Sequence, residues 1–199
     1  KTFEVGTFKK PIMKKYINYI VFLITITGCK AQSPVLDISV PQEGTKGAYY
    51  KDVYGVLDGY DGTYLYTKGN TSFKLMLKKK VKSYGYYYED LVVGEFQFIE
   101  NGVEIGNTLA NMAKNYTDEY INHIIKGNMV YTGTELGCPD CSPTEKRLRL
   151  SFVDNKSDNI AGMTIRKTIV SGKPAIKVKI WWDGFIIKRQ GDPAPAPGT

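Results

Sequence analysis

A strict alternation of apolar and polar side chains over 72–82 is the clearest pattern in the chain. Phe73, Leu75, Leu77 and Val81 fall on one face of an extended strand, where Lys79 interrupts them. The other face carries serine, methionine and lysines. A period of two predicts an antiparallel strand with one buried and one solvated face.

The same period recurs along most of the chain. A second long strand is predicted over 86–100, and Asn101-Gly102 predicts a hairpin turn into a returning strand over 103–109. Runs between turn sequences predict further strands over 63–67, 129–132, 147–153, 161–170, 176–182 and 185–188, with Asp183-Gly184 as the last turn. The segment 110–127 has no clear period.

One short helix is predicted ahead of these strands. Tyr49, Val53, Val56 and Leu57 recur at spacings of three and four, and Gly59 ends the pattern. Eight or nine antiparallel strands behind one helix predict an all-β fold. We expect a lipocalin-like barrel, with a two-sheet β-sandwich as the alternative. The barrel is favoured because Gly62-Thr63-Tyr64 is similar to the Gly-x-Trp that begins the first lipocalin strand, with Tyr in place of Trp.

The N-terminal region predicts export and a lipid anchor. Met13-Lys14-Lys15 precedes a mainly apolar run over 16–27, and Ile26-Thr27-Gly28 precedes Cys29. A basic start, a short apolar stretch and small residues before a cysteine are typical of a lipoprotein signal peptide. The run is too short to cross a bilayer as a helix, which needs about 20 residues. We therefore expect the thiol of Cys29 to be lipidated and to begin the mature chain.

This signal divides the chain into regions. We interpret 1–12 as an over-extended N-terminus, 13–28 as the signal peptide and 29–46 as a flexible linker after the lipid. A single β-domain is expected over 47–190, followed by a Pro-rich, disordered tail over 191–199.

Removing the signal also changes the charge. The whole chain has a formal net charge of +7 and a pI of about 9.1. Residues 1–29 hold five of the 27 Lys and Arg and one of the 20 Asp and Glu, which leaves 22 against 19, or +3. The mature protein is therefore not strongly basic, and no nucleic-acid partner is expected.

Two of the three cysteines remain after lipidation. Cys138 and Cys141 stand as Cys-Pro-Asp-Cys, and two cysteines of an exported protein usually pair, which predicts a structural disulfide. A thiol redox pair and half of a zinc site are the alternatives. No helix is predicted after the motif to lower a thiol pKa, and only the distant His123 remains as a further ligand. We expect no metal and no cofactor.

The remaining candidate residues are acidic or aromatic. Glu89 and Glu95 would lie about 20 Å apart on one strand, too far for the carboxylate pair of a glycosidase. The sole histidine, His123, is expected in a loop or at the surface. Asp90 is expected either to accept hydrogen bonds from tyrosines or to contact a ligand. The residues that could line a cavity for a carbohydrate or an apolar ligand are Tyr64, Tyr66, Tyr86, Tyr88, Asp90 and Trp182.

Several segments together resemble a family of small Bacteroidota lipoproteins, classed as a domain of unknown function (number 6705). They are Cys29-Lys30-Ala31-Gln32, Gly47-Ala48-Tyr49-Tyr50-Lys51-Asp52, Gly62-Thr63-Tyr64, Tyr88-Glu89-Asp90-Leu91-Val92-Val93-Gly94-Glu95 and Phe185-Ile186-Ile187-Lys188-Arg189-Gln190. The resemblance covers roughly 46–190. It implies a cell-envelope protein of a didermic bacterium and supplies no activity or site residues.

The sequence therefore predicts a lipid-anchored protein of the outer membrane, on either its periplasmic or its surface side. No nucleophile–base set, metal cluster or phosphate loop is recognisable in the sequence, so we expect a non-enzymatic protein. Its ligand would be a small apolar molecule, a carbohydrate or another envelope protein. The rival hypothesis is a periplasmic or surface hydrolase, or a thiol redox enzyme.

Overall fold

The computed structural model describes residues 33–40, 44–135, 137–154 and 159–186. The expected N-terminal extension, the signal peptide, Cys29 and the Pro-rich tail lie outside these residues. The described residues from Pro34 onward belong to one compact unit. Among the helices of the described residues, none has the length and apolar composition needed to cross a bilayer.

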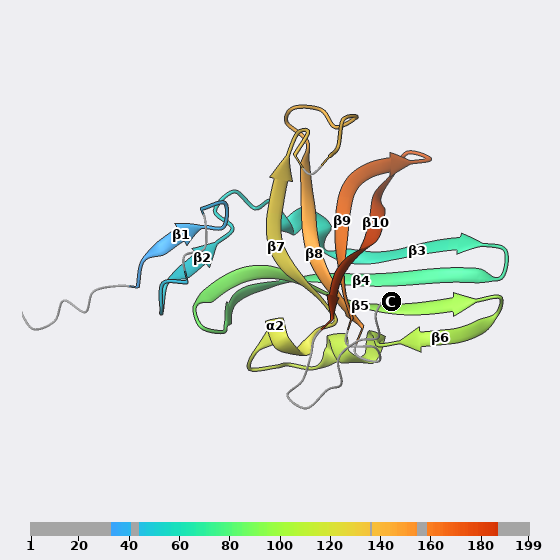
Figure 1. Cartoon of the computed structure of the whole chain (residues 1–199), viewed down its shortest axis with the longest axis horizontal. Helices are drawn as coiled ribbons and strands as arrows, with labels where there is room; N and C mark the ends of the chain where they lie inside the picture. Colours follow the sequence, from blue (N-terminus) through green and yellow to red (C-terminus); the bar gives the residue numbers. More distant parts are fainter. Residues whose placement is uncertain (1–32, 41–43, 136, 155–158, 187–199) are drawn as a thin grey trace, which may run out of the picture. The chain divides into compact units, whose positions relative to one another are not determined.

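Within the described residues, ten strands make up a single sheet (Figure 1). In chain order they are β1 (Val35–Asp37), β2 (Tyr49–Lys51), β3 (Gly62–Lys68), β4 (Thr71–Tyr84), β5 (Tyr88–Glu100), β6 (Val103–Asn107), β7 (Ile125–Thr132), β8 (Lys146–Asp154), β9 (Asn159–Val170) and β10 (Lys173–Ile186). Three short helices complete the described fold: η1 (Leu57–Tyr60), η2 (Leu109–Ala113) and α2 (Glu119–Asn122). The predicted all-β class is confirmed.

Strand β5 is the branch point of the sheet. One of its edges pairs with β4 from Tyr88 to Ile99. Its other edge pairs in succession with β2, β7 and β6. The strands β7–β10 therefore branch from the middle of β5 within the same sheet, and Figure 1 shows them rising away from the β3–β6 strands.

The main core lies in the angle between these two sets of strands. Buried side chains of β4, β5 and η1 meet those of β7, β8 and β9, and the cluster comprises Leu57, Tyr60, Leu75, Leu77, Val92, Ile124, Ile125, Leu148, Leu150, Met163 and Ile165. Gly94 allows the close approach, since a Cβ there would lie 2.7 Å from Leu77 Cδ2 and 3.0 Å from Ile125 Cβ. The opposite face of β5 is covered as well, where Leu91 and Val93 pack against Met112 of η2.

The predicted closed barrel is wrong. Within the described residues β3, β6 and β10 each pair with one neighbour only, so the sheet stays open. The alternative of two separate sheets is not observed either, because the long β5 joins both sets of strands. Alternation along single strands predicts that faces are buried, but it does not say whether the last strand returns to the first.

The predicted helix near Gly47–Gly59 is also wrong. Tyr49 and Tyr50 lie in β2, which pairs in parallel with both β1 and the start of β5. Asp52 then ends the strand, because its carboxylate accepts hydrogen bonds from the Val56 and Leu57 amides at 2.8 and 2.9 Å. Only a single 3-10 turn, η1, follows.

Two further boundaries differ from the sequence prediction. The segment expected as a linker contains β1, which pairs with β2 through the register Val35↔Tyr49. At the other end the chain does not turn at Asp183-Gly184. These two residues form an insertion in β10 between Trp182 and Phe185, and the strand stays paired with β9 on both sides.

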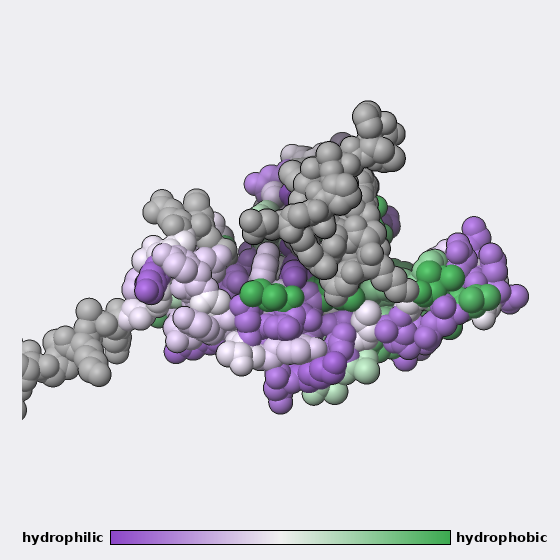
Figure 2. Space-filling view, turned by 60° about the horizontal axis from the view of Figure 1, so that its bottom comes forward, coloured by the Kyte–Doolittle hydropathy of each residue, from purple (hydrophilic) through white to green (hydrophobic). Residues whose placement is uncertain are grey.

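The hairpin predicted at Asn101-Gly102 is confirmed. Both residues have positive φ, 51° and 84°, and the flanking residues Glu100 and Val103 pair directly. Apolar side chains remain exposed on this hairpin and on β3–β4, where Figure 2 shows apolar surface beside hydrophilic edges; examples are Leu65, Val103 and Ile105.

Candidate ligand-binding pocket

A cavity of about 550 Å³ lies beside the branch in the sheet. It is lined by the β4–β5 turn, the start of β5, the start of α2 and the strands β7 and β8. The lining residues are Gly85, Tyr86, Tyr87, Glu89, Asp118, Tyr120, Ile121, Lys126, Gly127, Asn128, Met129, Arg149, Leu150 and Ser151. Its size falls within the range of small-molecule sites.

Three tyrosines supply the aromatic part of the wall. Tyr87 is held by an edge contact with the buried Tyr50, with ring centroids 4.8 Å apart, and Tyr86 lies 6.5 Å from Tyr87. Tyr120 lies under the Lys126 ammonium, whose Nζ is 5.3 Å from the ring centroid. Tyr86 and Tyr120 are 65% and 42% exposed, so both can still cover a ligand.

The polar part of the wall contains hydrogen-bond donors and acceptors, among them both acidic and basic side chains. Asn128 Nδ2 donates to Glu89 Oε2 at 2.7 Å and to the Asp90 carbonyl at 3.0 Å. Asp118 caps α2, since its Oδ1 accepts from the Ile121 amide at 3.0 Å. Lys126 and Arg149 add two cations.

Burial shifts the pKa values of two charged residues in this wall, Glu89 and Lys126. It raises the pKa of Glu89, and the negative charge of Asp118 raises it further, while the Asn128 hydrogen bond opposes the change. It lowers the pKa of Lys126, against the opposing effect of Asp118 and Glu95. A polar ligand that pairs with either group would relieve part of this desolvation cost.

Of the six residues predicted to line a cavity, Tyr86 lines this one. The Tyr64 hydroxyl instead donates to the Tyr60 carbonyl at 3.2 Å, and Tyr66 lies exposed on β3. Tyr88 packs against Tyr84 with centroids 5.1 Å apart. The side chain of Trp182 lies outside the described residues.

The Asp90 carboxylate accepts hydrogen bonds from other groups of the protein. Its Oδ1 accepts from the Tyr49 hydroxyl at 2.6 Å and the Lys82 amide at 2.9 Å, and its Oδ2 accepts from the Asp52 amide at 3.0 Å. Burial, together with the hydrogen bond to Asp90, raises the pKa of Tyr49. Asp90 therefore ties β2 to β4 and β5, as the first of the two sequence hypotheses expected, although its partner is Tyr49.

His123, expected in a loop or at the surface, lies in a loop position, but the surface alternative is wrong. His123 follows α2 and is 1% exposed. Its Nδ1 lies 2.7 Å from Glu95 Oε1 and its Nε2 lies 2.9 Å from Glu119 Oε2. Glu119 also accepts from Lys80 Nζ at 2.7 Å, so a chain of polar contacts runs from Glu95 through His123 and Glu119 to Lys80.

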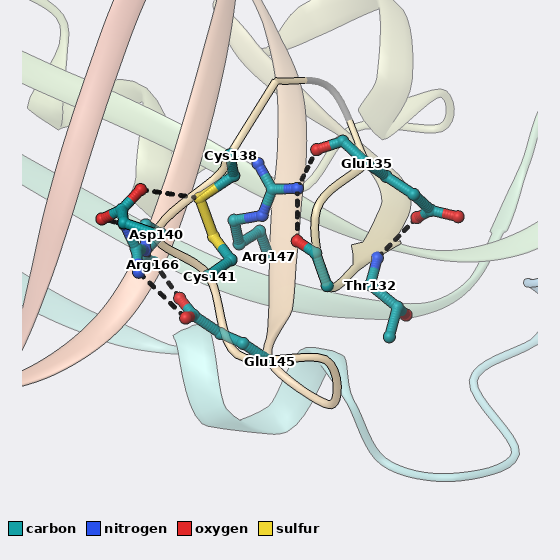
Figure 3. Close-up of a disulfide and its surroundings, with 9 residues drawn as sticks. Thr132, Glu135, Cys138, Asp140, Cys141, Glu145, Arg147 and Arg166 are labelled. Carbon is teal, nitrogen blue, oxygen red and sulfur yellow. Dashed lines mark hydrogen bonds and ion pairs between the residues drawn. A yellow bond between two sulfur atoms is a disulfide. The ribbon is translucent and has the colours of Figure 1, made fainter.

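Cys138 and Cys141 form the predicted disulfide in the loop between β7 and β8 (Figure 3). Cys138, Asp140 and Cys141 place their donor atoms within 4.8 Å of one another, which is compact enough for a metal ion. In the disulfide, however, neither sulfur is a thiolate ligand, and three donors fall short of a structural zinc site. Both half-cystines are also buried, at 7% and 6% exposure.

Sequence reasoning missed most of the pocket. Tyr120 and Lys126 belong to the segment without clear periodicity, and Asn128 directly follows it; the lining residues opposite them lie in β5 and β8. The one available signal was the local density of tyrosines around Tyr86 and Tyr87.

The chain belongs to a family of unknown function, DUF6705, whose model matches residues 13–189. This finding agrees with the family number inferred from the sequence. No curated protein and no solved structure matches the chain significantly.

Proposed function

We propose that this protein is a non-enzymatic binding protein of the cell envelope, anchored through lipid at Cys29, whose pocket takes a saccharide. The observation that carries the proposal is the cavity of about 550 Å³ walled by Tyr86, Tyr87 and Tyr120. Sugars present an apolar face that stacks on aromatic rings and hydroxyls that pair with amides and charged groups. This wall offers both the aromatic rings and the polar groups.

A purely apolar ligand fits the same pocket less well. Glu89, Asp118, Lys126 and Arg149 all line it. An apolar molecule would remove water from these groups without replacing the lost hydrogen bonds, at a cost of a few kcal/mol for each group. Saccharide hydroxyls donate to the carboxylates and accept from the cations.

The envelope location is proposed from the signal-like sequence over 13–28 and from Cys29. The disulfide supports it, because such bonds persist in exported proteins and are rare in the cytosol. The outer membrane is the proposed site of attachment.

One observation favours a hydrolase as the second candidate. Glu89 has a raised pKa and shares the pocket with Asp118, and glycosidases use a protonated and an ionised carboxyl group. Asn128 and the Ile121 amide hold these two carboxyl groups in structural hydrogen bonds, which supports binding without turnover. Prolonged incubation with a bound oligosaccharide distinguishes a binding protein from a hydrolase. A hydrolase releases shorter products, and Glu89→Gln should abolish their formation.

Saturation-transfer NMR against a panel of neutral and acidic oligosaccharides tests the proposal. We expect at least one saccharide to bind, and Tyr86→Ala and Tyr120→Ala each to weaken it roughly tenfold, which corresponds to about 1.4 kcal/mol of lost stacking. Tyr66→Ala is the matched control, since Tyr66 is 57% exposed but lies outside the pocket. A panel without binders, or equal losses in all three variants, contradicts the proposal.

A further inference from the structure

Cationic side chains gather on one face of strands β8, β9 and β10. Directly paired residues form two rows across these strands: Arg147, Arg166 and Lys177 in one, and Arg149, Thr164 and Lys179 in the next. Residues paired in this way have Cβ atoms about 5 Å apart, and like charges directly opposite each other destabilise a sheet. The other face of the same strands carries the core residues Leu148 and Ile165.

These residues line a groove of about 410 Å³. The disulfide loop bounds it with Gly137, Cys138 and Asp140, and Trp181 also lines it. Trp181 lies directly on Gly162, where a Cβ would come within 2.3 Å of the indole, and the Arg149 guanidinium lies 5.4 Å from the ring centroid. The lining thus contains five cations and a single carboxylate.

Among the described residues, Arg166 binds two carboxylates beside the groove, those of Asp140 and Glu145. Arg166 donates to Glu145 through Nε and Nη2 at 2.6 and 2.9 Å, and to Asp140 through Nη1 at 2.8 Å (Figure 3). Lys177 and Lys179 are exposed and have no ion-pair partner within the described part of the chain. Among the lining residues that the structure describes, cations therefore outnumber carboxylates, and Lys177 and Lys179 are the exposed ones.

Arg147 provides a second, independent indication of a ligand. It is 3% exposed, and its Nη2 donates to the uncharged carbonyls of Gly133 and Glu135 (Figure 3). Its Nε is buried and has no hydrogen-bond partner among the described residues. A buried guanidinium without an anionic partner and with an unused donor is costly to a fold.

We propose that this groove is a site for a phosphate group. A phosphate ester or free phosphate carries up to two negative charges and several acceptor oxygens, which suits converging ammonium and guanidinium groups better than a neutral hydroxyl or a single carboxylate does. Lys177 and Lys179 supply the exposed charge, and Arg147, which also lines the groove, supplies a buried guanidinium whose Nε–H is unused among the described residues. The site does not depend on saccharide binding, although Arg149 lines both cavities.

Lysines on the last strand of a sheet also prevent edge-to-edge aggregation. Such a protective role accounts for exposed Lys177 and Lys179, but it requires no unused donor on the buried Arg147 behind them. The two explanations differ in whether phosphate binds saturably.

NMR of the arginine Nε–H groups in the ¹⁵N-labelled full chain tests the site. Sodium phosphate is titrated against sodium chloride at equal ionic strength. We expect a saturable shift of the Arg147 Nε–H resonance with phosphate and none with chloride. Lys177→Gln/Lys179→Gln should weaken phosphate binding at least tenfold, and Lys68→Gln/Lys78→Gln, which removes the same charge from exposed positions outside the groove, should leave it unchanged.

The source of the phosphate is resolved by a second arm, in which vesicles of phosphatidylcholine with and without phosphatidylglycerol replace the free ion. A response to free phosphate assigns the site to a soluble ligand. A response to the phosphatidylglycerol vesicles alone assigns it to a lipid headgroup. No response in either arm, or an unaltered response of the Lys177→Gln/Lys179→Gln variant, overturns the proposal.

Discussion

His123 Nδ1 lies 2.7 Å from Glu95 Oε1, and both side chains are fully removed from solvent. Glu119 faces the other ring nitrogen at 2.9 Å. His123 thus lies between two carboxyl groups, one from β5 and one from α2. The contact between His123 and Glu95 joins the segment after α2 to β5 in the interior of the fold.

Removing His123 should destabilise the protein strongly. In His123→Ala the Glu95 carboxylate stays buried without its partner, and its Oε2 already has no hydrogen-bond partner among the described residues. We expect a loss of about 3–5 kcal/mol in the free energy of unfolding, measured by urea denaturation. Glu95→Gln/His123→Ala should recover part of that loss because the amide is uncharged. A loss below about 1 kcal/mol for His123→Ala would show that the pair contributes little.

Acid should destabilise the fold through Asp52 and Glu119. Burial alone would raise the pKa of Asp52, but Lys79 and the Leu57 and Val56 amides together hold it below the ordinary value. Lys80 and His123 likewise outweigh burial and lower the pKa of Glu119. A depressed carboxyl pKa gives stability that is present above the unfolded-state value of about 4 and is lost as the pH falls below it.

Asp52→Asn tests this pH dependence. We expect it to cost about 1–3 kcal/mol at pH 7 and to reduce the slope of stability against pH below about pH 4. Glu89→Gln is the contrasting control. The pKa of the Glu89 carboxyl group is raised, so its ionisation lowers the stability of the folded protein as the pH rises. Removing this ionisation should therefore cause no loss of stability at pH 7. Identical pH profiles for the parent and Asp52→Asn would contradict the assignment.

The disulfide should contribute a modest stabilisation. Cys138 and Cys141 are three positions apart, and closing so short a loop is worth about 2 kcal/mol in the chain-entropy account. Cys138→Ser/Cys141→Ser should lower the free energy of unfolding by that amount. Free thiols in native protein purified from the envelope would count against the bond.

The proposed lipidation at Cys29 predicts that Cys29→Ala is exported but neither acylated nor held at the membrane. Metabolic labelling with radioactive palmitate, followed by membrane fractionation, measures both effects. Incorporation of label into the Cys29→Ala protein would exclude that anchor.

The sequence contains the local parts of this fold. Alternation at Leu75 and Leu77 correctly marks a buried face, and Asn101-Gly102 correctly marks a hairpin turn, because each depends on neighbours along the chain. Tyr49 fits a helical spacing as well as a strand, and only its pairing with the distant β5 decides between them.

The pocket depends on such distant pairing throughout. Tyr86, Tyr120 and Arg149 come from three separated segments. They line one pocket because β7 and β8 branch from the middle of β5. His123 gives no local sign of burial, since its partner Glu95 lies 28 positions away. Periodicity carries no information on which strands share an edge.

The most direct test of the binding pocket is NMR of the protein with ¹³C-labelled tyrosine rings, titrated with an oligosaccharide that binds. Shifts concentrated at Tyr86, Tyr87 and Tyr120, with Tyr64, Tyr66 and Tyr88 unchanged, are the predicted result. Shifts concentrated at Tyr64, Tyr66 and Tyr88 would place the ligand elsewhere and contradict the pocket described above.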